Sequence, residues 1–135
     1  MMRFFPLLLV LVSATVSAEW VKVIGAADTN SEKFIDTKAI RQTGPMNTMR
    51  RVWELTNLAK TASNNASSTK SYVEYDCKDR RVRVLEENSF SETWAQGVNL
   101  SIAGKEGKHA LWSEIGKGSA SEIIFNRVCP NDDPD

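Results

Sequence analysis

Cys77 and Cys129 are the only two thiols in a chain of 135 residues. A free thiolate is a nucleophile or a metal ligand, whereas two thiols in an oxidising compartment form a disulfide. Because residues 1–18 are typical of an export signal, we expect both cysteines in one bridge. Closing a loop of about 50 residues would stabilise the fold by about 4 kcal/mol in the chain-entropy model. The bridge would leave no thiol for catalysis or for zinc.

The export signal is predicted from three features of residues 1–18. Arg3 supplies the positive charge, residues 4–12 are apolar, and small side chains precede a cleavage point after Ala18. The apolar part is shorter than the roughly 20 residues that span a bilayer. We therefore expect a mature chain that begins near Glu19, with no cysteine there for a lipid anchor. It would have no membrane segment after cleavage, and it would stay in the periplasm or reach the cell surface or the medium.

A second group of reactive side chains lies just after Cys77. It contains Lys78, Arg80, Arg81 and Arg83, and the last two project from the same face of a predicted strand. Guanidinium groups suit carboxylate-rich or sulfated partners, which predicts a ligand-binding patch. A second interpretation stays open, in which these cations pair across a hairpin with nearby acids: Glu74, Asp76, Asp79 and Glu86.

Other side chains that could do chemistry form no catalytic set. His109 is the single histidine, and its place after a glycine-rich turn favours an exposed loop residue over a general base. With no second histidine and no free thiol, we expect no transition-metal site. The acidic pairs at 86–87 and 132–133 are interpreted as solvated charge. We expect no enzymatic activity and no cofactor.

The composition predicts one near-neutral domain. The chain has 17 basic and 17 acidic side chains, so no net field attracts it to nucleic acid or to an anionic membrane. Residues 19–130 suffice for one domain, and residues 131–135 are an acidic tail that we expect to be disordered. Four tryptophans are expected to seed the core: Trp20, Trp53, Trp94 and Trp112.

Most of the chain has the alternating pattern of β-strands. In the clearest strand, residues 71–77, Val73 and Tyr75 share a face with Cys77. A tight turn leads to its partner strand, in which Val82 and Val84 point inward. Residues 62–69 are expected to form a polar loop. Further strands are expected at residues 19–27 and 33–40, and a second hairpin at residues 98–102 and 110–115.

Residues 48–58 fit a helical stripe and a strand face, and periodicity alone does not decide between them. The neighbouring strands favour a strand here.

One helix is predicted at residues 119–129. Ser119 and Glu122 match a capping box at its start, and Pro130 ends it. Ile124 and Phe125 begin i, i+4 pairs with residues 128 and 129, which gives one apolar face. This spacing directs Cys129 toward the sheet, where Cys77 can meet it.

With these elements in order, the chain resembles the surface-adhesin protein E family of Gram-negative bacteria. The matching pieces extend from Trp20 to Cys129. They are Glu19-Trp20, Phe34-Ile35-Asp36, Val52-Trp53, Tyr75-Asp76-Cys77, Arg80-Arg81-Val82-Arg83, Trp112, Gly118-Ser119 and Val128-Cys129-Pro130.

The resemblance implies an α+β, mainly β fold: a curved antiparallel sheet of about six strands, with a C-terminal helix docked on one face by the disulfide. It also implies a non-enzymatic surface protein that binds host proteins such as vitronectin, laminin and plasminogen. The alternative is a periplasmic or envelope-associated structural protein without a host ligand. An exposed edge strand would also permit a homodimer.

Overall fold

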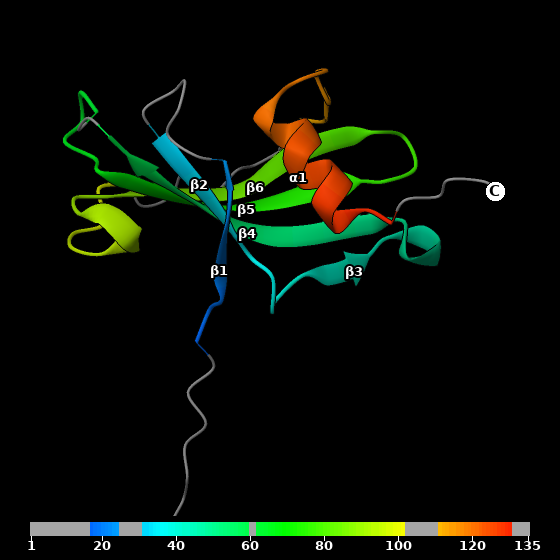
Figure 1. Ribbon diagram of the computed structural model, residues 1–135, viewed down its shortest axis with the longest axis horizontal. Coiled ribbons are helices and arrows are strands. Elements are labelled where there is room, and N and C mark those ends of the chain that lie inside the picture. The colour runs from blue at the N-terminus through cyan, green and yellow to red at the C-terminus, as the bar shows by residue number, and fades with distance from the viewer. Residues whose placement is uncertain (1–16, 25–30, 60–61, 102–110, 131–135) are drawn as a thin grey trace, which may run out of the picture.

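The computed structural model describes residues 17–24, 31–59, 62–101 and 111–130, which form one antiparallel sheet and one α-helix (Figure 1). The expected fold class is confirmed, with seven strands in place of about six. The elements are β1 (Trp20–Ile24), β2 (Ser31–Asp36), β3 (Arg41–Thr43), η1 (Pro45–Asn47), β4 (Met49–Leu58), β5 (Ser68–Asp76), β6 (Arg81–Phe90), η2 (Thr93–Ala95), β7 (Ser113–Glu114) and α1 (Ala120–Val128).

The strands of the sheet follow the order β1-β2-β4-β5-β6-β7, and β3 also pairs with β4. Both β2 and β3 lie on the edge of β4 that faces away from β5, one after the other. The β5–β6 ladder contains a register shift between Tyr72 and Val73, and such a bulge increases the local twist. The long strands β4, β5 and β6 form the centre of the sheet.

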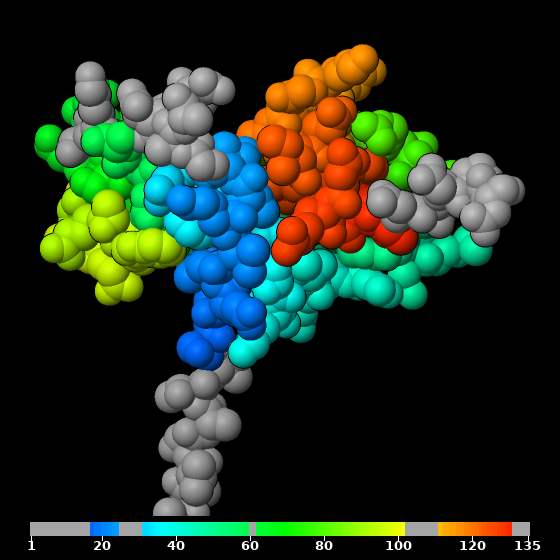
Figure 2. Space-filling model, in the orientation of Figure 1, coloured from blue at the N-terminus to red at the C-terminus, as the bar shows by residue number. Residues whose placement is uncertain are grey.

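One face of the sheet packs against α1 and carries the hydrophobic core. From the sheet it includes Ile35, Val52, Val73 and Tyr75, all nearly fully buried. Burying a side chain of this size contributes about 1.5–3 kcal/mol. In Figure 2, α1 and β1 lie side by side over this face. The helix supplies the remaining core residues: Ile124, Phe125, Val128 and Cys129.

The start and the end of α1 match the sequence-based prediction. Ser119 Oγ accepts a hydrogen bond from the Glu122 N–H at 3.2 Å, and Glu122 Oε1 accepts one from the Gly118 N–H at 3.2 Å. The expected bridge joins Cys77 to Cys129, whose Cα atoms are 5.6 Å apart. The helix is therefore capped at one end and fastened to the sheet at the other.

Residues 48–58 are resolved as a strand, because nearly all of this segment forms β4. Val52 points into the core beneath α1, and Trp53 lies on the opposite face. The strand expected at residues 33–40 ends earlier, at Asp36. Asp36 Oδ1 accepts a hydrogen bond from the Lys38 N–H at 3.1 Å, and this local side-chain bond turns the chain.

The expected hairpin between residues 98–102 and 110–115 is wrong. β7 pairs with β6 instead, with Glu114 opposite Arg81. Of residues 98–101, Asn99 makes a single bridge to Phe90.

The loop expected at residues 62–69 is shorter, because Ser68 belongs to β5 and is fully buried. Its hydroxyl donates to the Glu92 carbonyl at 2.6 Å and accepts from the Ala95 N–H at 3.0 Å. These long-range bonds satisfy a polar side chain that its local sequence places in a loop.

The expectation that the tryptophans seed the core is also wrong. None of the four is among the buried residues, and Trp94 is 45% exposed. Aliphatic side chains fill most of the core instead, together with Tyr75, Phe125 and Cys129. Trp53 and Trp112 contact cationic side chains on the opposite face of the sheet.

Several predictions concern residues outside the described part of the chain. They are the signal peptide up to residue 16, His109 and the acidic tail at residues 131–135. In the part that the structure describes, no helix combines the length and the apolar character needed to cross a membrane.

Candidate functional site

The face of the sheet opposite α1 carries cationic, acidic and aromatic side chains. On β5, Val73 and Tyr75 face the helix, so the residues that alternate with them project from the other side together with their cross-strand partners. The turn η2 covers one end of this face, where the Trp94 ring lies against Phe34 and N–H groups of η2 donate to Asn57 and Ser68. We call the remainder the open face: Arg41, Arg51, Trp53, Lys70, Tyr72, Glu74, Asp76, Arg81, Arg83 and Trp112.

Glu74 is the centre of the open face. It is 1% exposed, and it lies between Arg51 on β4 and Arg83 on β6. Arg83 donates to Glu74 Oε1 from Nε at 2.9 Å and from Nη2 at 2.6 Å, and Arg51 Nε donates to Oε2. Thr43 adds a hydroxyl donor at 3.3 Å. One buried carboxylate therefore holds two guanidinium groups in place.

Arg81 is held in a similar way beside it. Its Nη2 group lies 2.8 Å from Asp76 Oδ2 and 3.7 Å from Asp79 Oδ2. The guanidinium groups of Arg81 and Arg83 lie 4.7 and 4.3 Å from the ring centre of Trp112. These distances are those of cation–π contacts. Trp112 thus joins two arginines of β6 into one arrangement.

The other two residues of the predicted patch lie apart from this pair. Arg80 has a positive φ of 51° in the turn before β6, and its side chain lies 4.7 Å from the Phe125 ring and 3.6 Å from Glu122 on α1. Lys78 is exposed at the same turn. The structure therefore brings Arg81 and Arg83 together and directs Arg80 toward the helix.

The sequence allowed two interpretations of these cations, a ligand-binding patch and ion pairs across a hairpin, and the structure agrees in part with each. The arginines pair with Glu74, Asp76 and Asp79, three of the four acids considered, while Glu86 accepts a hydrogen bond from Asn88 instead. The pairs still leave guanidinium surface on the open face, because Arg81 and Arg83 are only half-buried. Whether this surface binds a ligand stays a prediction.

The two buried carboxylates are ionised because of these contacts. Burial alone would raise the pKa of Glu74, but hydrogen bonds from Arg51 and Arg83 outweigh it and hold that pKa below its usual value. For Asp76, burial is outweighed by the bond from Arg81 and by backbone N–H groups of the following turn, which also lower its pKa. At neutral pH the arginines therefore have ionised counter-ions.

A row of aromatic rings on the open face was not predicted from the sequence. The rings of Trp53 and Tyr72 stack with centres 4.7 Å apart and an interplanar angle of 24°. Lys70 Nζ lies 4.7 Å from the Trp53 ring and 5.9 Å from that of Trp20. The signal for this row was the register of β4 against β5, which places Trp53 opposite Tyr72.

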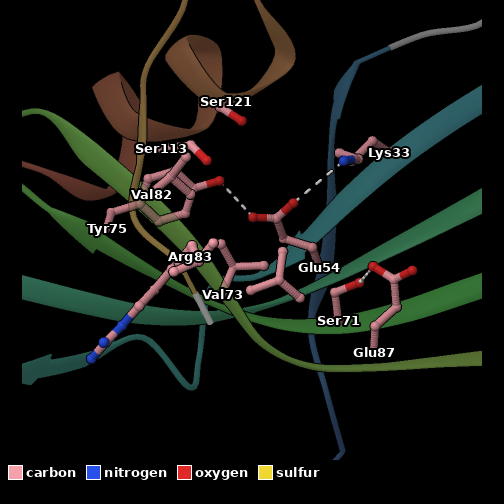
Figure 3. Close-up of a pocket in the computed structure, with 12 residues that line it drawn as sticks. Lys33, Glu54, Ser71, Val73, Tyr75, Val82, Arg83, Glu87, Ser113 and Ser121 are labelled. Carbon is pink, nitrogen blue, oxygen red and sulfur yellow. Dashed lines mark hydrogen bonds and ion pairs between the residues drawn. The ribbon is translucent and has the colours of Figure 1, made fainter. Parts of the chain in front are cut away.

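A polar pocket of about 330 Å³ lies on the other face, beside α1 (Figure 3). Its buried acid, Glu54, accepts hydrogen bonds from the Tyr75 hydroxyl at 2.5 Å and from Lys33 Nζ at 3.4 Å. Ser71 donates to Glu87 at 3.1 Å. Arg83 lines this pocket only with its stem, and its guanidinium group points away from it.

The pocket in Figure 3 is interpreted as a structural network. Burial, then the negative charge of Glu54, raises the pKa of Tyr75, so its hydroxyl stays protonated and donates. Because both oxygens of Glu54 already accept a hydrogen bond, the network ties β2 and β5 to β4. Among the described residues, no cluster of three or more acids, histidines or cysteines could hold a metal ion.

A family model described as "Surface-adhesin protein E" matches residues 20–130. No curated protein sequence matches the chain significantly.

Solved structures of Haemophilus influenzae protein E share the fold. Crystal form II is 16% identical and has a TM-score of 0.60, with 72% of this chain and 79% of that chain covered. Protein E from non-typeable Haemophilus influenzae is 17% identical and has a TM-score of 0.56, with 84% and 79% covered.

Proposed function

Because the chain belongs to the surface-adhesin protein E family, we propose that it is an exported adhesin that binds host extracellular matrix or plasma proteins. The family implies a surface-exposed binding protein rather than an enzyme. Vitronectin, laminin and plasminogen are the ligands that the family resemblance suggests. The ligand surface in this proposal is the open face together with the turn at Lys78.

One observation carries this proposal: Arg81 and Arg83 are held over Trp112 by buried carboxylates. Arg83 donates to Glu74 from Nε and Nη2. The N–H groups of its Nη1 are not bound to Glu74, so they can donate to a carboxylate of a partner protein. Side chains that are already fixed lose less conformational entropy on binding. Arginine and tryptophan are also the residues that most often dominate binding interfaces.

The test is direct binding of the mature protein to immobilised vitronectin, laminin and plasminogen at low and near-physiological salt. Lys78→Glu changes an exposed charge on the proposed surface, and Trp112→Leu removes the ring between the arginines. Lys117→Glu is the matched control, because it makes the same change at an exposed position before α1. Reversing Arg83 is avoided, because a new carboxylate would face buried Glu74.

We expect Lys78→Glu and Trp112→Leu each to weaken binding about tenfold, and Lys117→Glu to leave it unchanged. Equal binding by all variants would refute the open face as the ligand surface. No binding to any of the three proteins would refute their assignment as ligands and favour the periplasmic structural alternative, which fractionation of the producing cell tests independently.

A homodimer also stays a proposal. β1, β3 and β7 each pair with one strand only in the described sheet, and an exposed edge strand is a route to pairing. The molar mass in solution, measured by light scattering, tests it.

A further inference from the structure

A groove opens on the open face where two strands leave β4. β2 pairs with β4 as far as Glu54, and β3 pairs with it only up to Arg51. Alongside Val52 and Trp53, β4 is therefore paired only with β5. The chain between β2 and β3 leaves a cavity of about 390 Å³ at this break, which is within the size range of pockets for small ligands. It is lined by Lys38, Ala39, Ile40, Arg41, Trp53 and Tyr72.

The wall of this groove is an aromatic pair. Trp53 and Tyr72 stack on one another with ring centres 4.7 Å apart, so neither ring needs to be ordered when a ligand arrives. The face of an aromatic ring carries partial negative charge and attracts weakly positive C–H groups. The C–H face of a sugar ring presents such groups, so a rigid aromatic wall suits a saccharide.

The charged lining of the groove is entirely cationic. It contains Lys38 and Arg41 and no carboxylate. Lys38 has one ion pair, 3.4 Å from exposed Glu19, and exposed pairs of this kind contribute little. Arg41 is exposed, and its side chain makes no ion pair and no hydrogen bond to any other residue in the described part of the chain. The groove therefore favours an anion.

The register strengthens this conclusion. Arg41 lies directly opposite Arg51, and like charges at opposed positions of a sheet repel. Glu74 binds the Nε group of Arg51 and so compensates one of the two cations, whereas no acid among the described residues pairs with Arg41. A bound carboxylate or sulfate would supply the missing counter-ion, and a guanidinium group binds either through two parallel hydrogen bonds.

We propose that this groove binds an acidic saccharide, with a sugar ring against Trp53 and Tyr72 and its carboxylate or sulfate on Arg41 and Lys38. An extended acidic peptide fits less well. Strand addition needs a continuous free edge, and β4 is paired on this side both before and after the break. The groove is distinct from the Arg81–Trp112 arrangement, so the two sites can be tested separately.

The experiment measures binding of three probes to the mature protein by isotope-edited NMR and by titration. The probes are a heparin-derived oligosaccharide, which is sulfated, a hyaluronan oligosaccharide, which carries carboxylates only, and an oligoglutamate peptide. We expect one or both saccharides to shift the signals of the Trp53 indole and to bind more tightly than the peptide. The two saccharides distinguish which anionic group is preferred.

Arg41→Gln is the decisive variant, because Arg41 is exposed and its side chain makes no ion pair or hydrogen bond within the described fold. We expect it to weaken saccharide binding about tenfold, while Arg127→Gln, an exposed change on α1, has no effect. Trp53→Leu should weaken it as well, and its thermal unfolding shows whether the fold is kept.

Three results would overturn the proposal: no saccharide binding, peptide binding of equal strength, or saccharide binding unchanged in Arg41→Gln. If Trp112→Leu loses host-protein binding but still binds the saccharide, the two sites are independent, as proposed. Failure of the saccharide alone would therefore refute the groove and leave the adhesin proposal standing.

Discussion

At the scale of single residues, the protein places acids where they organise cations. Glu74 is buried yet binds Arg51 and Arg83, and Asp76 does the same for Arg81. Removing one partner of a buried pair is costly, because the remaining charge loses its compensation. The residues that shape the open face are therefore also part of its stability, and charge reversals at Arg81 or Arg83 would confuse binding with folding.

The lowered pKa values of Glu74 and Asp76 predict acid sensitivity. A carboxyl whose pKa is lower in the folded state contributes stability above its unfolded pKa, near 4.5 for Glu and 3.8 for Asp. That stability is lost as the pH falls through the folded-state pKa. We expect the free energy of unfolding, measured with urea, to fall from about pH 5 to about pH 3.

Glu74→Gln should make this fall shallower, because one of the two groups no longer titrates. Glu86→Gln is the control, since Glu86 is exposed and bonds only Asn88 in the described residues. An identical pH dependence in wild type and Glu74→Gln would contradict the assignment.

The Tyr75 hydroxyl is expected to stabilise the fold through Glu54. Tyr75→Phe removes the 2.5 Å hydrogen bond and leaves an oxygen of a buried carboxylate without its donor. We expect a loss of about 2 kcal/mol in the free energy of unfolding. Tyr72→Phe is the matched control, because its ring stacks on Trp53 and its hydroxyl makes no hydrogen bond in the described structure. Equal losses in both variants would argue against a role for the Glu54 network.

At the scale of elements, the fold depends on the attachment of α1. The helix is short, with nine residues, and isolated helices of this length are marginal in water. Its cap at Ser119, its buried face and the Cys77–Cys129 bridge act together. The bridge is the only covalent link between the helix and the sheet other than the chain itself.

Replacing both Cys77 and Cys129 by Ser should lower the free energy of unfolding by about 4 kcal/mol, the value expected for a closed loop of this length. Chemical denaturation measures this loss. A reductant should destabilise the wild type by a similar amount and leave the double variant unaffected. If the reductant destabilised both proteins equally, the bridge would not be the cause.

The sequence predicted the elements whose signals are local, such as the capping box of Ser119 and the alternation from Val73 to Cys77. It did not predict pairings that depend on distant residues. β7 joins β6 through only two residue pairs, too few to leave a pattern. The side chain of Asp36 ends β2 by accepting a hydrogen bond from the Lys38 N–H, and the alternation of apolar and polar residues gives no sign of such a bond. The tryptophans were assigned to the core by residue type, whereas the register places Trp53 beside Tyr72 on the open face.

At the scale of the whole molecule, a near-neutral chain separates its properties onto two faces. The face under α1 carries the apolar core and is covered in part by the helix and β1, which lie side by side in Figure 2. The open face combines arginines, lysines and aromatic rings with two buried acids. The chain has zero net charge and nevertheless carries a local cationic surface, and a surface of this kind can attract an anionic partner whatever the net charge.

Side-chain footprinting by hydroxyl radicals, with and without the host protein that binds, tests the central claim most directly. On the open face, Trp112 and Trp53 report contact, and on α1 the exposed Ile123 is the reference. If the open face is the ligand surface, Trp112 becomes protected in the complex and Ile123 stays as reactive as in the free protein. Protection of Ile123 with Trp112 unchanged would contradict the account.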